Sequence, residues 1–271
     1  MAESGERRML FDIRGRRKHV VRVVYAILAL LMGASLFLVV GPFSIGNLIG
    51  NGGTTSAAKV SQERSERIEQ KLRREPESEA LLLALTRSRI AASNSLTEVS
   101  SETGATVHTP EGIQELERGI EAWGSYLKQS KGPQASAALL VAQSYFSLAE
   151  YLAASGAGLE EVVENIEGAA KTQRLAAEAQ PTINSLTTQA IYEYYAGNFA
   201  AGDKAVKQAE AKAPSKAEAK EVGKQMAEFR ERGKAFEKQK KEAEKEEAKF
   251  GKERLQNPLG GLSGSTGSLG E

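Results

Sequence analysis

The sequence predicts an all-α protein: an N-terminal transmembrane helix, then a domain of helical hairpins, then a long charged C-terminal helix. Three observations support this fold class. The 271-residue chain is rich in residues that favour helix, chiefly Ala, Glu, Lys, Leu and Gln. An uncharged apolar stretch of 19 residues spans 23–41. From Lys59 onward apolar residues recur at helical spacing, and no alternating run is long enough to predict a strand.

The apolar stretch near the N-terminus has the length of a membrane-spanning helix. Seven Arg and Lys residues lie within 1–22, and none follows until Lys59. This asymmetry predicts a basic cytoplasmic segment (1–22), a transmembrane helix (23–42), a flexible linker (43–58) and an extracytoplasmic C-terminal domain. The expected location is therefore the plasma or inner membrane, with the lipid bilayer contacted through this single helix.

Two other interpretations of the stretch fit the sequence less well. A cleaved signal peptide has an apolar region of roughly 7–15 residues followed by a small-residue cleavage site, and neither feature fits here. A buried helix of a soluble domain does not explain why the basic residues all lie on one side. The anchor is the favoured interpretation.

The first helices of the outer domain are predicted over 59–74 and 77–96, with Pro76 at the start of the second. A polar loop (97–109) follows and is expected not to pack. Thr109 and Pro110 have the pattern of a helix N-cap followed by proline at the first helical position. The next helix, 112–130, places its apolar residues on one face and ends before Pro133.

Two more helical hairpins follow. The segment 134–155 is apolar nearly all round, so we expect it to lie between neighbouring helices. Glycines at 156 and 158 turn the chain into a helix over 159–180, which stops at Pro181. The last pair spans 182–196 and 199–213, with a Gly-Asn turn between them and Pro214 at the end. The three hairpins therefore form units of about 77–133, 134–181 and 182–214, a period typical of helical repeats.

The last unit resembles the tetratricopeptide repeat, in which small residues at two fixed positions of the second helix flank a large apolar residue. Gly202 and Ala209 take the small positions, Val206 the large one, and Phe199 the aromatic one. The other units match through Gly119 and Trp123, and through Ala169 and Ala176, with Gln173 replacing an apolar residue. Glu193 falls where the motif has Tyr, unless a longer turn gives the role to Tyr194.

The resemblance implies a superhelical TPR-like solenoid over 59–214 that binds other proteins. First helices line the concave groove in this family, so the resemblance makes Tyr145, Tyr192 and Tyr195 candidate partner contacts. The alternative is a generic α-helical bundle.

The C-terminal part, 215–254, is predicted to be a capping and charged helix, followed by a disordered tail (255–271). Ser215 and Glu218 form a capping box. Apolar residues at 222, 226, 229 and 236 give a seam that docks on the last unit, with Gly233 and Lys240 interrupting it. Beyond about residue 237 the helix is charged all round and expected to be solvated. A coiled-coil partner stays open, although the seam is short.

The residue inventory argues against catalysis. The chain has no Cys, two His (His19 and His108) and two Asp (Asp12 and Asp203). No nucleotide-binding, hydrolase or metalloprotease motif is present, and His108 is expected to be exposed in a loop. We therefore expect no enzyme, cofactor, metal, nucleic acid or small-molecule substrate. An unrecognised enzyme acting through His108 or Glu193 is the minor alternative.

The sequence thus predicts a membrane-anchored scaffold for protein–protein interaction, with assistance to envelope protein assembly or translocation as one possible role. The alternative is a structural envelope protein that oligomerises through its C-terminal helix.

Overall fold

The computed structural model describes residues 55–99 and 106–256, with side chains described within 57–245. The predicted transmembrane helix (23–42), the cytoplasmic segment, most of the linker and most of the tail lie outside these residues. Helices account for 83% of what is described, so the all-α prediction is confirmed. The elements are α2 (Thr55–Leu72), α3 (Glu79–Ser95), β1 (Thr97–Val99), β2 (Thr106–His108), α4 (Pro110–Gln129), α5 (Ala135–Ser155), α6 (Leu159–Ala179), α7 (Ile183–Tyr195), α8 (Phe199–Ala211) and α9 (Lys216–Gln256).

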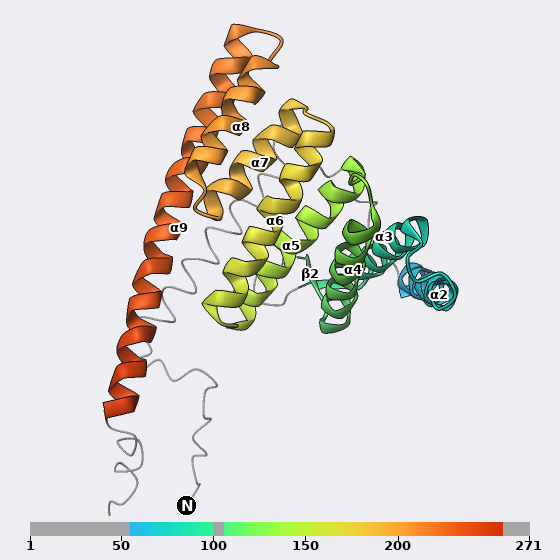
Figure 1. Ribbon diagram of the computed structural model, residues 1–271. Coiled ribbons are helices and arrows are strands. Elements are labelled where there is room, and N and C mark those ends of the chain that lie inside the picture. The colour runs from blue at the N-terminus through green and yellow to red at the C-terminus, as the bar shows by residue number, and fades with distance from the viewer. Residues whose placement is uncertain (1–54, 100–105, 257–271) are drawn as a thin grey trace, which may run out of the picture.

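The helices lie side by side in chain order, from α2 at one end to α9 at the other (Figure 1). Helices α2 to α8 pack chiefly against their neighbours in sequence, and α9 packs on both α7 and α8. This is the arrangement expected when one hairpin cannot bury its own apolar face. The tight turns use the predicted residues. Gly156 and Gly197 adopt φ values of 77° and 80°, in the left-handed region where glycine carries no steric penalty.

The start of α4 follows its predicted cap. The side chain of Thr109 accepts a hydrogen bond from the Gly112 backbone N–H at 3.1 Å, and Pro110 occupies the first helical position. The start of α3 differs from the prediction, because the helix begins at Glu79 after Ser78, and Pro76 lies in the preceding turn.

The segment predicted as a polar loop contains a short antiparallel β-hairpin. Strands β1 and β2 pair through Thr97 with His108 and Val99 with Thr106. The backbone N–H of Thr109 also donates to the Leu96 carbonyl at 2.9 Å, which fastens the base of the hairpin between α3 and α4. Strands of three residues give too short an alternation to be recognised in sequence.

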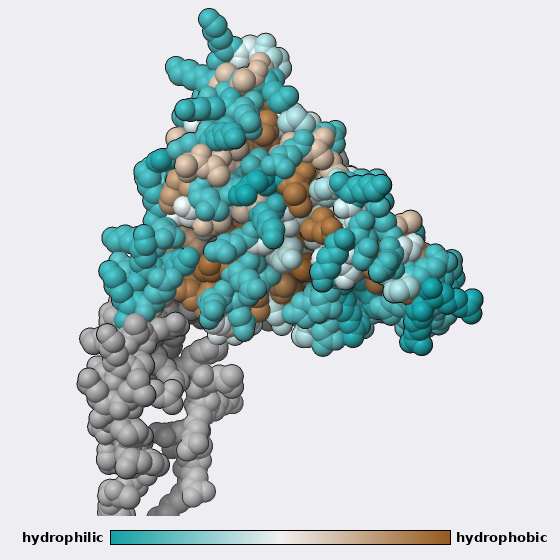
Figure 2. Space-filling model, viewed as in Figure 1, coloured by the Kyte–Doolittle hydropathy of each residue, from teal (hydrophilic) through white to brown (hydrophobic). Residues whose placement is uncertain are grey.

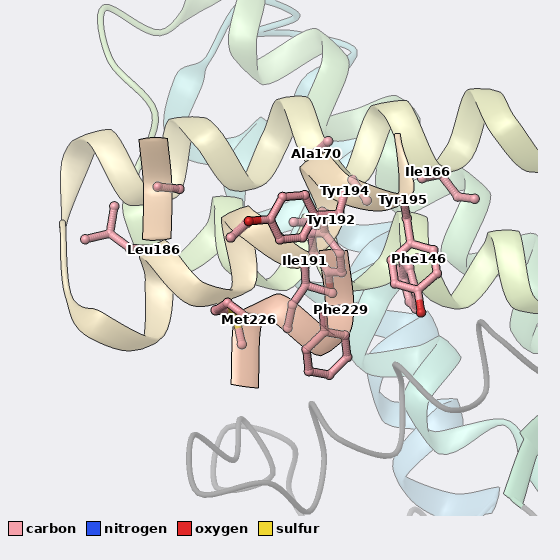
Figure 3. Close-up of a cluster of buried hydrophobic side chains, with 14 of the residues drawn as sticks. Phe146, Ile166, Ala170, Leu186, Ile191, Tyr192, Tyr194, Tyr195, Met226 and Phe229 are labelled. Atoms are coloured by element: carbon pink, nitrogen blue, oxygen red, sulfur yellow. The ribbon is translucent and has the colours of Figure 1, made fainter. Parts of the chain in front are cut away.

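Two large hydrophobic clusters form most of the core, and a small third cluster of Ile68, Leu85 and Ala122 packs α2 against α3 and α4. The first, here the N-terminal cluster, is centred on Ile90, Leu116, Trp123 and Val141 from α3, α4 and α5. The second, the C-terminal cluster, joins α5 to α9 and is rich in aromatic residues (Figure 3). Helix α5 contributes to both clusters, as its apolar sequence predicted.

Within the described residues, α5 is the one helix long and apolar enough to cross a membrane by length and composition. Half of that apolar window is buried inside the domain. The core helix of a folded domain has the same properties.

A buried ion network ties α2 to the rest of the domain. Nη1 of Arg89 donates to both carboxylate oxygens of Glu115 on α4, at 3.0 and 2.7 Å. Its Nη2 donates to Glu69 on α2 at 2.5 Å. Since both Arg89 and Glu115 are almost fully buried, loss of either partner would leave an uncompensated charge in the interior.

Helix α9 docks along α7 and α8 through the predicted seam, and Val222, Met226, Phe229 and Phe236 are all buried. Gly233 does not interrupt this seam, contrary to the prediction. It is buried as well, and a Cβ built there would lie 2.6 Å from the carbonyl oxygen of Tyr194. The glycine therefore marks a point where the backbones of α7 and α9 approach too closely to leave room for a Cβ.

Candidate functional site

An open groove of about 750 Å³ lies on α6, α7 and α8. Its floor is made of short or apolar side chains, Ala177, Leu186 and Ala205, which are all buried. Longer polar side chains stand around this floor. The lining residues are Arg174, Ala177, Glu178, Pro181, Leu186, Gln189, Ala201, Lys204, Ala205, Gln208, Ala211 and Lys212.

Arg174 is held in the groove wall by a buried carboxylate. Its Nε and Nη2 both donate to Oε1 of Glu193, at 3.0 and 2.6 Å. The other oxygen of Glu193, Oε2, accepts from the side-chain amide of Asn198 at 2.9 Å. The Glu193 side chain is fully buried, whereas that of Arg174 is 44% exposed. The guanidinium is therefore held by a buried carboxylate, while part of the Arg174 side chain remains exposed to solvent.

The groove is basic. Three of its lining side chains are cationic, Arg174, Lys204 and Lys212, and one is anionic, Glu178. Both lysines are exposed, and neither forms an ion pair with another residue in the described ranges. Their charges are thus available to a ligand. Much of the surface seen in Figure 2 is hydrophilic, with apolar patches showing between the helices.

Two of the tyrosines predicted to contact a partner are core residues instead. Tyr192 and Tyr195 are each 1% exposed. The ring of Tyr192 stacks on Phe146 at 4.9 Å, and the ring of Tyr195 meets Phe236 of α9 edge-on at 5.8 Å. Helix α9 covers this side of α7, so these side chains line no surface; Figure 3 shows them among the other buried residues.

The third candidate, Tyr145, is half-buried on α5. Its ring packs against Gly168 of α6, where an added Cβ would lie 2.8 Å from Cδ1 of the ring. Burial raises the pKa of this tyrosine, and the nearby Glu164 adds to the rise. Burial likewise raises the pKa of Tyr195 to about 12. These hydroxyls stay protonated at neutral pH, which suits packing residues.

His108 is not the exposed loop residue that was predicted. It lies half-buried on β2, with Nδ1 3.3 Å from the hydroxyl of Ser93 and 3.2 Å from its carbonyl oxygen. Burial lowers the pKa of the imidazole, and the hydrogen bond to Ser93 opposes this only in part. Among the described residues no group of three or more His, Asp and Glu side chains could hold a metal ion.

The sequence did not predict this groove, because the tetratricopeptide resemblance placed the partner-binding residues on the first helix of each pair. The groove is lined mainly by the second helices, α6 and α8, with α7 supplying the floor residue Leu186. A signal did exist in the sequence of α8 and its C-cap, where the small residues Ala205 and Ala209 are buried and the cationic Lys204 and Lys212 lie eight positions apart.

Fold and site together define a class: an all-α protein of stacked helical hairpins with a basic groove on its second helices. Comparison with family models, curated proteins and solved structures gave no match. The assignment of a function therefore depends on the residues themselves.

Proposed function

We propose that the chain is a membrane-anchored scaffold that binds a segment of another protein in the groove on α6, α7 and α8. The observation that carries the proposal is Arg174, whose guanidinium is fixed by buried Glu193 while it stays open to solvent. Such a preorganised donor beside an apolar floor binds a ligand without first losing side-chain freedom.

The helix pairs are proposed to be TPR-like repeats. Support comes from close contacts at the small positions. The Cβ of an alanine at Gly119 would lie 2.9 Å from Cγ1 of Ile90, and Ala169, Ala176 and Ala209 are buried. Gln173 departs from the motif but is buried with a hydrogen bond to the Ser185 carbonyl at 2.9 Å, so its polar group is satisfied.

The membrane anchor and the extracytoplasmic location of the domain are proposed from the charge asymmetry around 23–42. Protease added to intact spheroplasts tests this topology. We expect cleavage within residues 60–271, and the same cleavage pattern after lysis. Complete protection of this region until lysis would contradict the proposed orientation.

Binding in the groove is tested by site-specific crosslinking in intact cells. A photo-reactive residue replaces Gln208, which is exposed and lines the groove, in the full-length chain. The matched control carries it at Glu117, which is exposed on α4. We expect a defined adduct with another protein from position 208 and none from position 117. No adduct from 208, or equal adducts from both, would contradict a groove-bound partner.

One observation favours the alternative of an oligomerising protein: α9 continues to Gln256, and of its side chains described after Phe236, up to residue 245, Ala243 alone is buried. Deletion of 237–271 separates the two functions. Loss of both the oligomeric state and the adduct from 208 would favour the structural role, whereas a retained adduct supports the groove.

A further inference from the structure

We infer that the groove accepts an extended acidic segment of a partner protein, with its carboxylates bound by Arg174, Lys204 and Lys212. The inference rests on the proposed scaffold function and names the chemistry of its partner. It follows from the charges, spacing and floor of the groove.

Charge favours an acidic ligand. The three cations outnumber Glu178, the one acidic side chain of the lining. The two bonds from Arg174 to Glu193 use its Nε and Nη2. Nη1 takes part in no hydrogen bond recorded within the described ranges, so the exposed edge of the guanidinium can donate to a second carboxylate. Arginine is suited to this role because its planar fork matches a carboxylate.

Spacing favours an extended ligand with repeated acids. Lys204 on α8 and Lys212 at its C-cap are eight residues apart, which is about 12 Å along a helix that rises 1.5 Å per residue. An extended chain advances about 3.3 Å per residue, so side chains four positions apart lie about 13 Å apart and on the same side. Two glutamates at positions i and i+4 of the partner would therefore reach both lysines.

The floor and the amides suit the rest of such a segment. Beside the buried floor, Pro181 and Ala211 are exposed and Ala201 is half-buried, and they present an apolar surface that small or branched side chains can cover. The side-chain amides of Gln189 and Gln208 also line the groove. No hydrogen bond from either amide is recorded within the described part of the chain, which leaves both free to bind the partner's backbone.

A second copy of this chain is the competing occupant. Its exposed acidic residues at the start of α6, Glu160, Glu161, Glu164 and Glu167, carry the complementary charge. They lie on a helix, however, and the spacing of the lysines fits an extended segment, so a separate partner is the favoured occupant.

The test measures fluorescence polarisation with the full-length chain in detergent micelles at physiological ionic strength. The probe is a fluorescein-labelled short peptide with two glutamates four positions apart and valine and threonine between them. The matched probe has glutamine at both positions. We expect the acidic peptide to bind about tenfold more tightly than its glutamine counterpart, as loss of close charge pairs predicts.

Charge reversal in the groove supplies the matched variants. The double variant Lys204→Glu, Lys212→Glu should weaken binding of the acidic peptide at least about tenfold. Lys207→Glu is the control, because Lys207 is exposed on α8 but does not line the groove. A peptide with lysines in place of the glutamates should bind the double variant more tightly than the parent, a gain that misfolding cannot produce.

Several results would overturn the inference. These are no binding of the acidic peptide, equal affinity for the glutamine peptide, or equal weakening by Lys207→Glu. Self-association that the double variant abolishes, without acidic-peptide binding, would identify a second copy as the occupant. An adduct from position 208 that persists in the double variant would keep the scaffold function while rejecting the acidic partner.

Discussion

The ring of Tyr194 covers Gly202, so that a Cβ added to the glycine would lie 2.6 Å from Cδ1 of the ring. The same ring stacks on Phe199 at a centroid distance of 6.1 Å. The Tyr194 hydroxyl donates to Asp203 at 2.9 Å, and Arg230 of α9 donates to the same carboxylate at 2.9 Å. Tyr194 and its hydrogen-bond partner Asp203 thereby link α7, α8 and α9.

Replacement of Gly202 tests this contact. Gly202→Ala should lower the free energy of unfolding by about 1–3 kcal/mol, because the new methyl group overlaps a packed ring that cannot move freely. Gly124→Ala is the control. Gly124 lies within α4 with no atom close enough to meet an added Cβ, so alanine should stabilise by roughly 0.5–1 kcal/mol. Urea unfolding of both variants measures the difference, and a Gly202→Ala protein as stable as the parent would contradict the contact.

Replacement of Gly233 tests the docking of α9. Gly233→Ala should weaken the packing of α9 on α7, because its Cβ would meet the backbone of Tyr194, which cannot rotate away. We expect faster amide hydrogen exchange in α9 around Val222–Phe236. At Gly223 on the same helix, an added Cβ meets only the flexible carboxylate of Glu210. Gly223→Ala should therefore leave exchange unchanged, and equal effects of the two variants would refute a close backbone approach at 233.

Glu193→Gln tests the buried carboxylate that holds Arg174 in the groove wall. Loss of the charge weakens both bonds from Arg174 while the arginine stays partly solvated. A cost of about 1–3 kcal/mol is expected, below that of a fully buried pair. Glu178→Gln is the control, since Glu178 is exposed and forms no ion pair among the described residues. Thermal unfolding of the two variants compares them, and an equal stability loss would show that the Glu193 pair contributes nothing.

His108 predicts a pH dependence of stability. Burial places its folded-state pKa below the ordinary value of 6.5, so the unfolded chain binds a proton more readily. The stabilisation from the neutral imidazole is present above pH 6.5 and is lost as the pH falls below it toward the folded-state pKa. Urea unfolding between pH 5 and 7.5 should show a smaller loss of stability on acidification in His108→Asn than in the parent. Parallel curves for the two proteins would contradict the burial of this imidazole.

Sequence reasoning located the helices well, because their ends depend on local chemistry. Thr109 with Pro110, Gly156 and Gly197 each set a helix end through a cap or a turn that only neighbouring residues decide. The β-hairpin was missed because its pairing of Glu98 with Val107 joins residues across a segment with no long alternating pattern.

The candidate site was harder to predict, because it depends on contacts between helices. Arg174 and Glu193 are 19 residues apart, and their bond forms only after α6 and α7 pack together. The burial of Tyr195 likewise depends on Phe236 of α9, which covers the face where a groove had been expected. Periodicity shows which residues share a helix face, but not which neighbouring helix will cover that face.

Helix α5 contributes buried side chains to both the N-terminal and the C-terminal cluster. Its Val141 belongs to the N-terminal cluster, and Phe146, little more than one turn further on, belongs to the C-terminal cluster. Neither cluster is therefore complete without this helix. A chain break in the turn before Pro133 would separate α5 from α3 and α4. We therefore expect the hairpins to unfold together as a single cooperative unit, because both clusters depend on α5.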